Sequence, residues 1–295
     1  MSARPEGRPK TTLAALAAKK RAGEPIVMVT AYDHPSAQIA EDAGVDMILV
    51  GDSAAMTVLG HPDTLSMTVD EMTMLAGAVS RGAAVPFIVV DLPFGSYEAS
   101  DEQAVRTAQH FVKNARCDAV KLERGGTTVE RARAIVQAGI PVMGHIGLTP
   151  QTATSLSGYR AQGTTAEAAL ALYRDALALE AAGCFAIVLE AVPSRVAELV
   201  VAPLRVPVIG IGAGPAADGQ VLVLHDLVGL YRGPRARFVK RYADARTLLT
   251  EAIAGYAADV ASRAYPAPEH GYGVPPEEVA AFAELIAREP QPPRR

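Results

Sequence analysis

The stretch AGVDMILVGD, residues 43–52, contains the pattern on which the fold prediction rests. A helical segment ends at Gly44, an apolar run follows at 47–50, and Asp52 comes just after that run. Glycine just past a helix readily adopts the left-handed conformation that ends it. An apolar run without polar alternation indicates a strand covered on both faces, as in a parallel sheet. The stretch therefore predicts one helix–strand unit of an α/β protein.

The same unit recurs along the chain. Further apolar runs lie at 26–30, 87–90, 119–122, 142–144, 186–189, 206–211 and 221–224. Segments with helical spacing separate them, at 34–43, 68–81, 101–114, 129–138, 166–182 and 195–201. Such alternation is typical of either a closed barrel or an open doubly wound sheet. Because 295 residues fit a barrel of roughly 250 residues with extensions, we expect an α/β fold of the (β/α)8 TIM barrel type.

The barrel is expected to cover 11–265. Residues 1–10 are expected to be a disordered N-terminus, and 266–295 a C-terminal extension with a short helix at 276–288. The segment 146–163 is longer than an ordinary βα loop and rich in Thr, Ser and Gly, which favours a functional lid or substrate wall. The GIGAG stretch at 210–214 is either a tight turn with close backbone packing or a phosphate-binding loop.

Composition narrows the class of protein. Hydrophobic residues make up 49% of the chain and charged residues 20%, which allows a large buried core. The net charge of −4 and the interspersed signs argue against nucleic-acid binding, which needs a basic face. The apolar runs are too short to span a bilayer. Cys117 and Cys184 form no CxxC pair, so we expect buried thiols rather than a disulfide or zinc site, and a cytoplasmic location.

Acidic residues recur where the expected strands end. Asp52, Asp91, Glu123 and Glu190 hold such positions, and His145 closes the run at 142–144. A single Asp after a strand is usually the N-cap of the next helix. Yet no helix is expected soon after Asp91, and Glu123 is followed by an Arg-Gly-Gly sequence. In a barrel the carboxyl ends of the strands open on one face, where active sites are built. The position of these acids is therefore better explained by their meeting in one active site than by helix capping.

Clustered carboxylates raise one another's pKa unless a cation lies among them. Mg²⁺ prefers oxygen ligands and usually takes one or two protein carboxylates. We therefore predict Mg²⁺ at Asp52 and Asp91, with Glu123 reaching the ion directly or through a water. Lys121 lies two residues before Glu123 and should point the same way, toward either a substrate carboxylate or Glu123 itself.

This arrangement suits a small α-keto acid. A keto acid can chelate magnesium, and the ion then stabilises the enolate that forms when the neighbouring carbon loses a proton. The base should be a carboxylate that is not a ligand and comes from another strand, and Glu190 fits best.

An ordered set of motifs runs through the chain from about 12 to 265. It comprises VGDS at 50–53, GH at 60–61, DLPF at 91–94, KLE at 121–123, GHIGLTPQ at 144–151, LEAVP at 189–193 and GIGAG at 210–214. Together these motifs resemble the ketopantoate hydroxymethyltransferase (3-methyl-2-oxobutanoate hydroxymethyltransferase) family. The sequence departs from that family's pattern at Arg124, which replaces a glycine, and at Ala54 and Ala55, which replace a Leu-Gly pair.

The resemblance implies a barrel of the phosphoenolpyruvate/pyruvate-binding type. It implies transfer of a hydroxymethyl group from 5,10-methylenetetrahydrofolate to 3-methyl-2-oxobutanoate, giving 2-dehydropantoate for pantothenate and coenzyme A synthesis. By residue, it implies one Mg²⁺ per subunit and a homo-oligomer, a decamer, with metal ligands Asp52, Asp91 and Glu123, substrate contacts Asp52, Ser53, Asp91 and Lys121, and proton acceptor Glu190. The folate contacts are not implied.

Two other functions fit the same barrel. One is a magnesium-dependent lyase or mutase of the phosphoenolpyruvate/isocitrate lyase type, because a fold does not determine a function. Such enzymes carry a nucleophilic cysteine or extra arginines near the metal, whereas neither cysteine here ends a strand. The other is a non-catalytic binding barrel, which the intact set of acids from Asp52 to Glu190 argues against.

Overall fold

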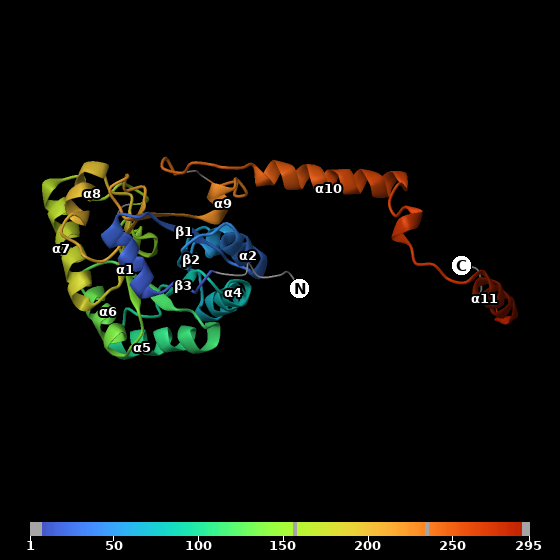
Figure 1. The fold of residues 1–295 in the computed structure, drawn as a ribbon, viewed down its shortest axis with the longest axis horizontal. Helices are drawn as coiled ribbons and strands as arrows, with labels where there is room; N and C mark the ends of the chain where they lie inside the picture. The colour runs from blue at the N-terminus through green and yellow to red at the C-terminus, as the bar shows by residue number, and fades with distance from the viewer. Residues whose placement is uncertain (1–7, 156–157, 234–235, 291–295) are drawn as a thin grey trace. The chain divides into compact units, whose positions relative to one another are not determined.

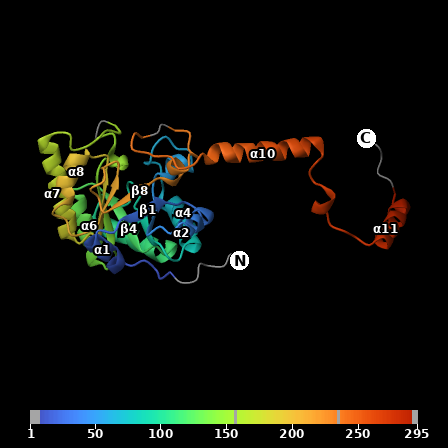
Figure 2. The same ribbon diagram turned by 45° about the horizontal axis from the view of Figure 1, so that its top comes forward.

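The computed structural model describes residues 8–155, 158–233 and 236–290. Within these residues, eight parallel strands pair in chain order and close into a barrel. Figures 1 and 2 show the strands at the centre and helices around them. This confirms the predicted (β/α)8 architecture and rules out an open doubly wound sheet.

The strands lie close to the predicted apolar runs. They are β1 (Ile26–Thr30), β2 (Met47–Val50), β3 (Phe87–Asp91), β4 (Ala119–Glu123), β5 (Val142–Gly147), β6 (Ala186–Glu190), β7 (Val208–Ile211) and β8 (Gly219–Leu222). Three strand-end acids are thus the last hydrogen-bonded residues of their strands rather than the residues after them. The eighth strand begins two residues earlier than the run at 221–224, since Gly219 and Gln220 pair with both neighbouring strands.

Helices and turns connect these strands. In the barrel unit they are α1 (Leu13–Ala22), α2 (His34–Asp42), α3 (Ala54–Thr57), α4 (Val69–Gly82), α5 (Asp101–His110) with a π-helical turn at Phe111–Ala115, α6 (Thr128–Gln137), the 3-10 turn Pro150–Thr152, α7 (Ala166–Ala182), α8 (Ser194–Val201) and α9 (Leu224–Leu227). Side-chain caps begin several of them. Asp33 accepts from the amide of Ser36, and Thr68 forms a capping box with Glu71.

The alternation of side chains along the strands creates two cores. Outward-pointing residues pack against the helices in a large cluster that includes Ile48, Val90, Leu122 and both cysteines, which are free and buried. Inward-pointing residues fill the lower part of the barrel, where Leu16 of α1 joins Met28, Met47, Leu49, Phe87, Val89, Ala119, Met143, Val188, Ile209 and Val221. The barrel is therefore a packed interior rather than a pore.

Above this apolar filling the inward positions become polar. Every second residue of a strand points into the barrel. On β3 these residues are Phe87, Val89 and Asp91, and on β4 they are Ala119, Lys121 and Glu123. The register sets Asp91 beside Lys121 and Glu123 beside His145. The period of two thus brings the strand-end groups together at one mouth of the barrel.

The chain divides into two units. The first ends at Ala243, and the second, Asp244–Arg295, contains α10 (Ala245–Ser262), the turn Pro268–His270 and α11 (Pro276–Arg288). The helix α11 spans the range expected from the sequence. The boundary between the units, after Ala243, lies earlier in the chain than the expected boundary at 265. The helix α10 belongs to the second unit, and none of its residues is buried. Among the described residues, no helix is long and apolar enough to cross a membrane.

The expected disorder of 1–10 falls partly outside the described residues, which start at Arg8. Arg8 donates to the carbonyl of Gly44, and Lys10 pairs with Asp118 at 2.6 Å.

Gly147 tests how tightly the mouth is built. Its φ is +94°, and an added Cβ would overlap the carbonyl oxygen of Glu190. Gly139 has a similar φ of +88° but open space around it. We expect Gly139→Ala to cost about 1 kcal/mol for the left-handed backbone alone. Gly147→Ala should cost about 1–3 kcal/mol more because of the overlap.

The free energy of unfolding in urea measures both costs. Equal costs for the two variants would contradict the close approach of Gly147 to Glu190.

Candidate active site at the mouth of the barrel

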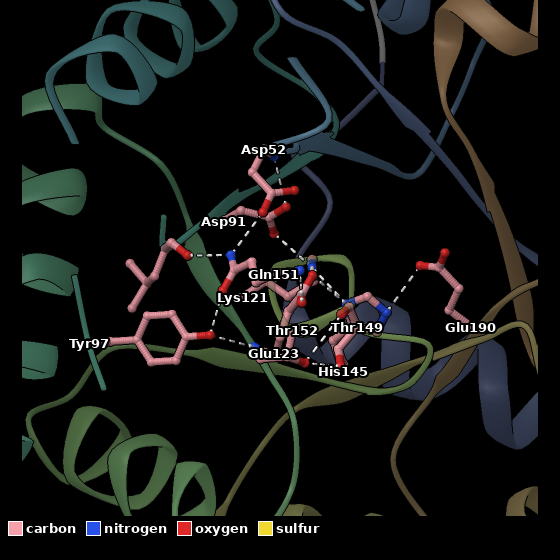
Figure 3. A network of polar contacts seen from close by, with 11 residues as sticks. Asp52, Asp91, Tyr97, Lys121, Glu123, His145, Thr149, Gln151, Thr152 and Glu190 are labelled. Atoms are coloured by element: carbon pink, nitrogen blue, oxygen red, sulfur yellow. Dashed lines mark hydrogen bonds and ion pairs between the residues drawn. The ribbon is translucent and has the colours of Figure 1, made fainter. Parts of the chain in front are cut away.

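The strand-end carboxylates form one buried network (Figure 3). The backbone N–H of Asp52 donates to Oδ2 of Asp91 at 3.0 Å. Oδ1 of Asp91 lies 3.0 Å from the Nζ of Lys121, although no well-directed hydrogen bond reaches that oxygen. Nζ also lies 3.9 Å from Oε1 of Glu123. Lys121 and Glu123 share a face, as expected, and both are buried.

The charges in this network are poorly balanced. Burial would lower the pKa of Lys121, but Asp91, Glu123 and Asp52 together raise it, so its ammonium is retained. Burial and the neighbouring Asp91 raise the pKa of Asp52 well above its usual range. Burial raises the pKa of Glu123 to about 7, against the opposing effect of Lys121. One ammonium therefore does not compensate three carboxylates in a dry site, and a further cation fits there.

Three of these acids can donate oxygens to such a cation. In the described part of the chain, no three His, Cys, Asp or Glu side chains are grouped as a ready-made metal cage. Mg²⁺ does not require one, because it commonly keeps several waters and takes one or two carboxylates. Asp52 and Asp91 are adjacent through the 3.0 Å hydrogen bond, and the hard oxygen donors suit magnesium rather than a soft metal.

Ser53 and Glu190 lie at the edges of the network. The Oγ of Ser53 is 2.8 Å from the hydroxyl of Tyr32, in the loop after β1. Glu190 ends β6, and its partly buried side chain approaches the network from the far side of His145 (Figure 3). The six residues predicted as ligands, substrate contacts or base thus lie at the same mouth of the barrel.

His145 lies between the acids. Its Nδ1 is 3.1 Å from Nζ of Lys121 and 3.3 Å from Oε1 of Glu123, and its Nε2 is 3.2 Å from Oε2 of Glu190. An ammonium only donates, so Nδ1 must accept and the ring proton belongs on Nε2. Burial and Lys121 lower the pKa of His145, which keeps the ring neutral. The Nε2 proton therefore faces Glu190, although the N–H is not well aligned with that carboxylate.

Sequence reasoning missed two buried members of the network. Gln151 donates to Asp52 and to Glu123, and the hydroxyl of Tyr97 donates to Gln151. Gln151 belongs to the GHIGLTPQ motif, which was the available signal, whereas Tyr97 lies in an irregular segment without any pattern. The first part of the 146–163 segment is thus packed onto the site, with Leu148, Thr149 and Gln151 buried.

Arg124, which departs from the family pattern, has a φ of +81°. This left-handed backbone suits the glycine of the pattern, and an arginine there bears a cost of roughly 1 kcal/mol. The side chain is exposed, so the departure leaves the buried network intact.

The GIGAG stretch at 210–214 has the close packing expected of a tight turn. An added Cβ at Gly214 would overlap Ser194, and the connection from β7 runs directly to β8.

Solved structures with the same fold support this architecture. Phosphonopyruvate hydrolase in complex with oxalate and Mg²⁺ has a TM-score of 0.57 and 14% sequence identity, over 93% of this chain and 96% of the other. A 2,3-dimethylmalate lyase, described as a member of the PEP mutase/isocitrate lyase superfamily, has a TM-score of 0.54 and 19% identity, over 94% and 96% of the two chains. At these identities the likeness concerns the fold alone.

Sequence comparison is more specific. Proteins named 3-methyl-2-oxobutanoate hydroxymethyltransferase are 52% identical in Acidothermus cellulolyticus, over 92% of this chain and 100% of the relative, and 50% identical in Nitratidesulfovibrio vulgaris strain DP4, over 95% and 90%. The profile of the family described as ketopantoate hydroxymethyltransferase matches residues 10–268, which include the whole buried network. This chain belongs to the ketopantoate hydroxymethyltransferase family.

Proposed function

We propose that this enzyme transfers a hydroxymethyl group from 5,10-methylenetetrahydrofolate to 3-methyl-2-oxobutanoate. The product is 2-dehydropantoate, an intermediate of pantothenate and coenzyme A synthesis. The observation that carries the proposal is the family match over residues 10–268, within which Asp52, Asp91, Lys121 and Glu123 form one buried site. Nothing in the described residues favours the lyase or mutase alternative, since Cys117 and Cys184 are packed in the outer core.

Asp52 and Asp91 would hold one Mg²⁺, and Glu123 would complete the site directly or through a water. Their fit rests on burial and on the neighbouring carboxylate of Asp91, which together raise the pKa of Asp52 and Glu123 although Lys121 opposes the rise. When bound, the ion would act as a Lewis acid on the keto oxygen and favour removal of the neighbouring proton. The Mg²⁺ and oxalate named for the phosphonopyruvate hydrolase structure are in keeping with this proposal.

The keto acid would contact Asp52, Ser53, Asp91 and Lys121. The ammonium of Lys121 is buried and retained as a cation, so it can balance the substrate's carboxylate in a site otherwise lined by acids. Ser53 would offer its hydroxyl, which Tyr32 holds at 2.8 Å.

Glu190 would accept the proton from C3 of the keto acid. It is separate from the proposed ligands, ends a different strand and retains some exposure to solvent. The Nε2 of His145 lies 3.2 Å from its carboxylate. The carbon that loses the proton would then bond to the one-carbon unit as the two bonds of that unit to folate nitrogens break. Water would supply the hydroxyl group, and tetrahydrofolate would leave with the proton from Glu190 and one from the water.

Proton exchange at C3 tests the assignment of Glu190. With 3-methyl-2-oxobutanoate and Mg²⁺ in heavy water, and without folate, the wild-type enzyme should replace the C3 proton by deuterium. Because a general base contributes about 10²–10⁴-fold, Glu190→Gln should slow exchange by that factor. NMR of the C3 and methyl signals measures the rate.

Glu198→Gln on α8 is a matched control, since Glu198 pairs with Arg195 away from the network. Wild-type exchange no faster than in EDTA would refute the enolate mechanism. The transfer itself is tested separately, because 2-dehydropantoate must appear once methylenetetrahydrofolate is added.

The affinity for Mg²⁺ should depend on pH. Burial raises the pKa of Glu123 to about 7, so the carboxyl keeps its proton below that pH and the ion must displace it. Affinity should rise with pH up to about 7 and then level off, by up to about tenfold per unit for one displaced proton. Calorimetric titration at several pH values measures it.

Glu123→Gln has no proton to displace at this position and should make the dependence weaker, with the remainder due to Asp52, whose pKa burial also raises. An unchanged slope in that variant would show that Glu123 is not the titrating group.

We further propose that the protein is a cytoplasmic homo-oligomer, a decamer. Free buried thiols at Cys117 and Cys184 suit a reducing compartment. The helix α10 exposes Leu248, Leu249, Ile253 and Tyr256 to solvent, and apolar side chains of this kind usually mark a protein interface.

Light scattering after size exclusion should give a mass of about ten subunits. Replacing Leu248 and Ile253 by Ser should lower that mass, and a monomeric wild type would contradict the proposal.

A further inference from the structure

Gln151 is the residue through which the loop after β5 reaches the carboxylates. It lies in the 3-10 turn Pro150–Thr152 and is 3% exposed. Its backbone N–H donates to Oε2 of Glu123 at 3.0 Å, and its side-chain NH₂ donates to Oδ2 of Asp52 at 2.8 Å. One residue therefore holds two acids that come from different parts of the barrel.

The remaining polar groups of this side chain are also satisfied. The NH₂ group makes a second hydrogen bond to the carbonyl of Leu92 at 2.9 Å, and Oε1 accepts from the hydroxyl of Tyr97 at 2.7 Å. Both protons of the amide and its carbonyl oxygen thus have partners, in a place without access to solvent.

The orientation of the amide is fixed by its partners. A carbonyl can only accept, so the NH₂ group must face Leu92, and its second proton then reaches Asp52. That leaves Oε1 toward Tyr97, whose hydroxyl is a donor. Burial and the charge of Glu123 raise the pKa of Tyr97, so the hydroxyl keeps its proton. A flipped amide would place its oxygen against the carbonyl oxygen of Leu92 and is excluded.

These contacts determine which carboxylate oxygens remain for a cation. Oδ2 of Asp52 and Oε2 of Glu123 are both engaged by Gln151. The other oxygen of Glu123, Oε1, faces Lys121 and His145, and the described contacts include no hydrogen bond to Oδ1 of Asp52. Each acid thus has one oxygen held by Gln151 and one that Gln151 does not engage.

We propose that Gln151 is a positioning residue for the metal site, which holds Asp52 and Glu123 so that one oxygen of each faces the ion. The proposal rests on the magnesium site proposed above. It assigns to Gln151 no contact with the ion or the substrate, because it acts through the two acids. Partners that orient metal ligands typically contribute about 10–100-fold to metal affinity or activity.

The test is calorimetric titration of the full-length protein with Mg²⁺ alone. Gln151→Met keeps the length of the side chain but removes the NH₂ donor, and the dissociation constant should rise by about 10–100-fold. Gln151→Asn keeps the amide but is one methylene shorter, so it should lose the 2.8 Å contact with Asp52 and show a similar rise.

A matched control is Gln103→Met. The amide of Gln103 also ties down a loop, with Nε2 donating to Gly95 and Oε1 accepting from Ala99, but it touches none of the acids. Its Mg²⁺ affinity should equal that of wild type. Thermal unfolding without metal shows whether each variant is folded, and only folded variants are compared.

The outcomes separate the two proposals. If wild type binds no Mg²⁺, the metal site itself is refuted, and the role of Gln151 with it. If wild type binds the ion and a folded Gln151→Met or Gln151→Asn binds it equally well, only the positioning role is overturned. If Gln151→Met does not fold, Gln151→Asn decides on the same criterion.

Discussion

In a closed eight-stranded barrel, every second residue of a strand points into a space that water does not fill. Here that constraint divides the interior into two levels. The lower level is apolar, closed from below by Leu16, while the upper level carries Asp91, Lys121, Glu123 and His145. The rest of the site follows from this division, because groups on the upper level must satisfy one another or a ligand.

The upper level is held by a chain of donors and acceptors rather than by independent ion pairs. Lys121 is shared between Asp91 and Nδ1 of His145, and it thereby fixes the tautomer of that imidazole. The tautomer in turn directs a proton toward Glu190. Lys121, which balances charge at the proposed ligands, thus also influences the proposed base through His145. The two halves of the site are therefore electrostatically coupled although they come from different strands.

Much of this arrangement could be predicted from the sequence because local pattern determined it. Apolar runs located seven strands within a few residues, and the acids at their ends followed from strand periodicity. The predicted start of the eighth strand was two residues too late, because Gln220 is exposed and breaks the apolar pattern. The actual start is determined by hydrogen bonds to the strands on both sides. The helix α10 was not separated from the barrel, since its composition resembles that of the packed helices.

The contacts of Gln151 and Tyr97 could not be foreseen for a different reason. They join segments 54 residues apart, between two irregular stretches of chain, and no periodicity constrains such stretches. Local patterns likewise did not predict the particular keto acid or the folate. Both were implied only by the resemblance of the ordered motifs to a known family.

The separation of levels has a consequence for which residues can vary. Apart from Lys121, the residues proposed to carry the chemistry are the last of their strands or lie just beyond them, and the apolar filling beneath them contains none of these groups. A strand-end residue can therefore differ without removing a side chain from the packing that fills the barrel. Solved barrels that are only 14–19% identical to this chain superimpose over most of its length, so the scaffold tolerates wide differences in sequence.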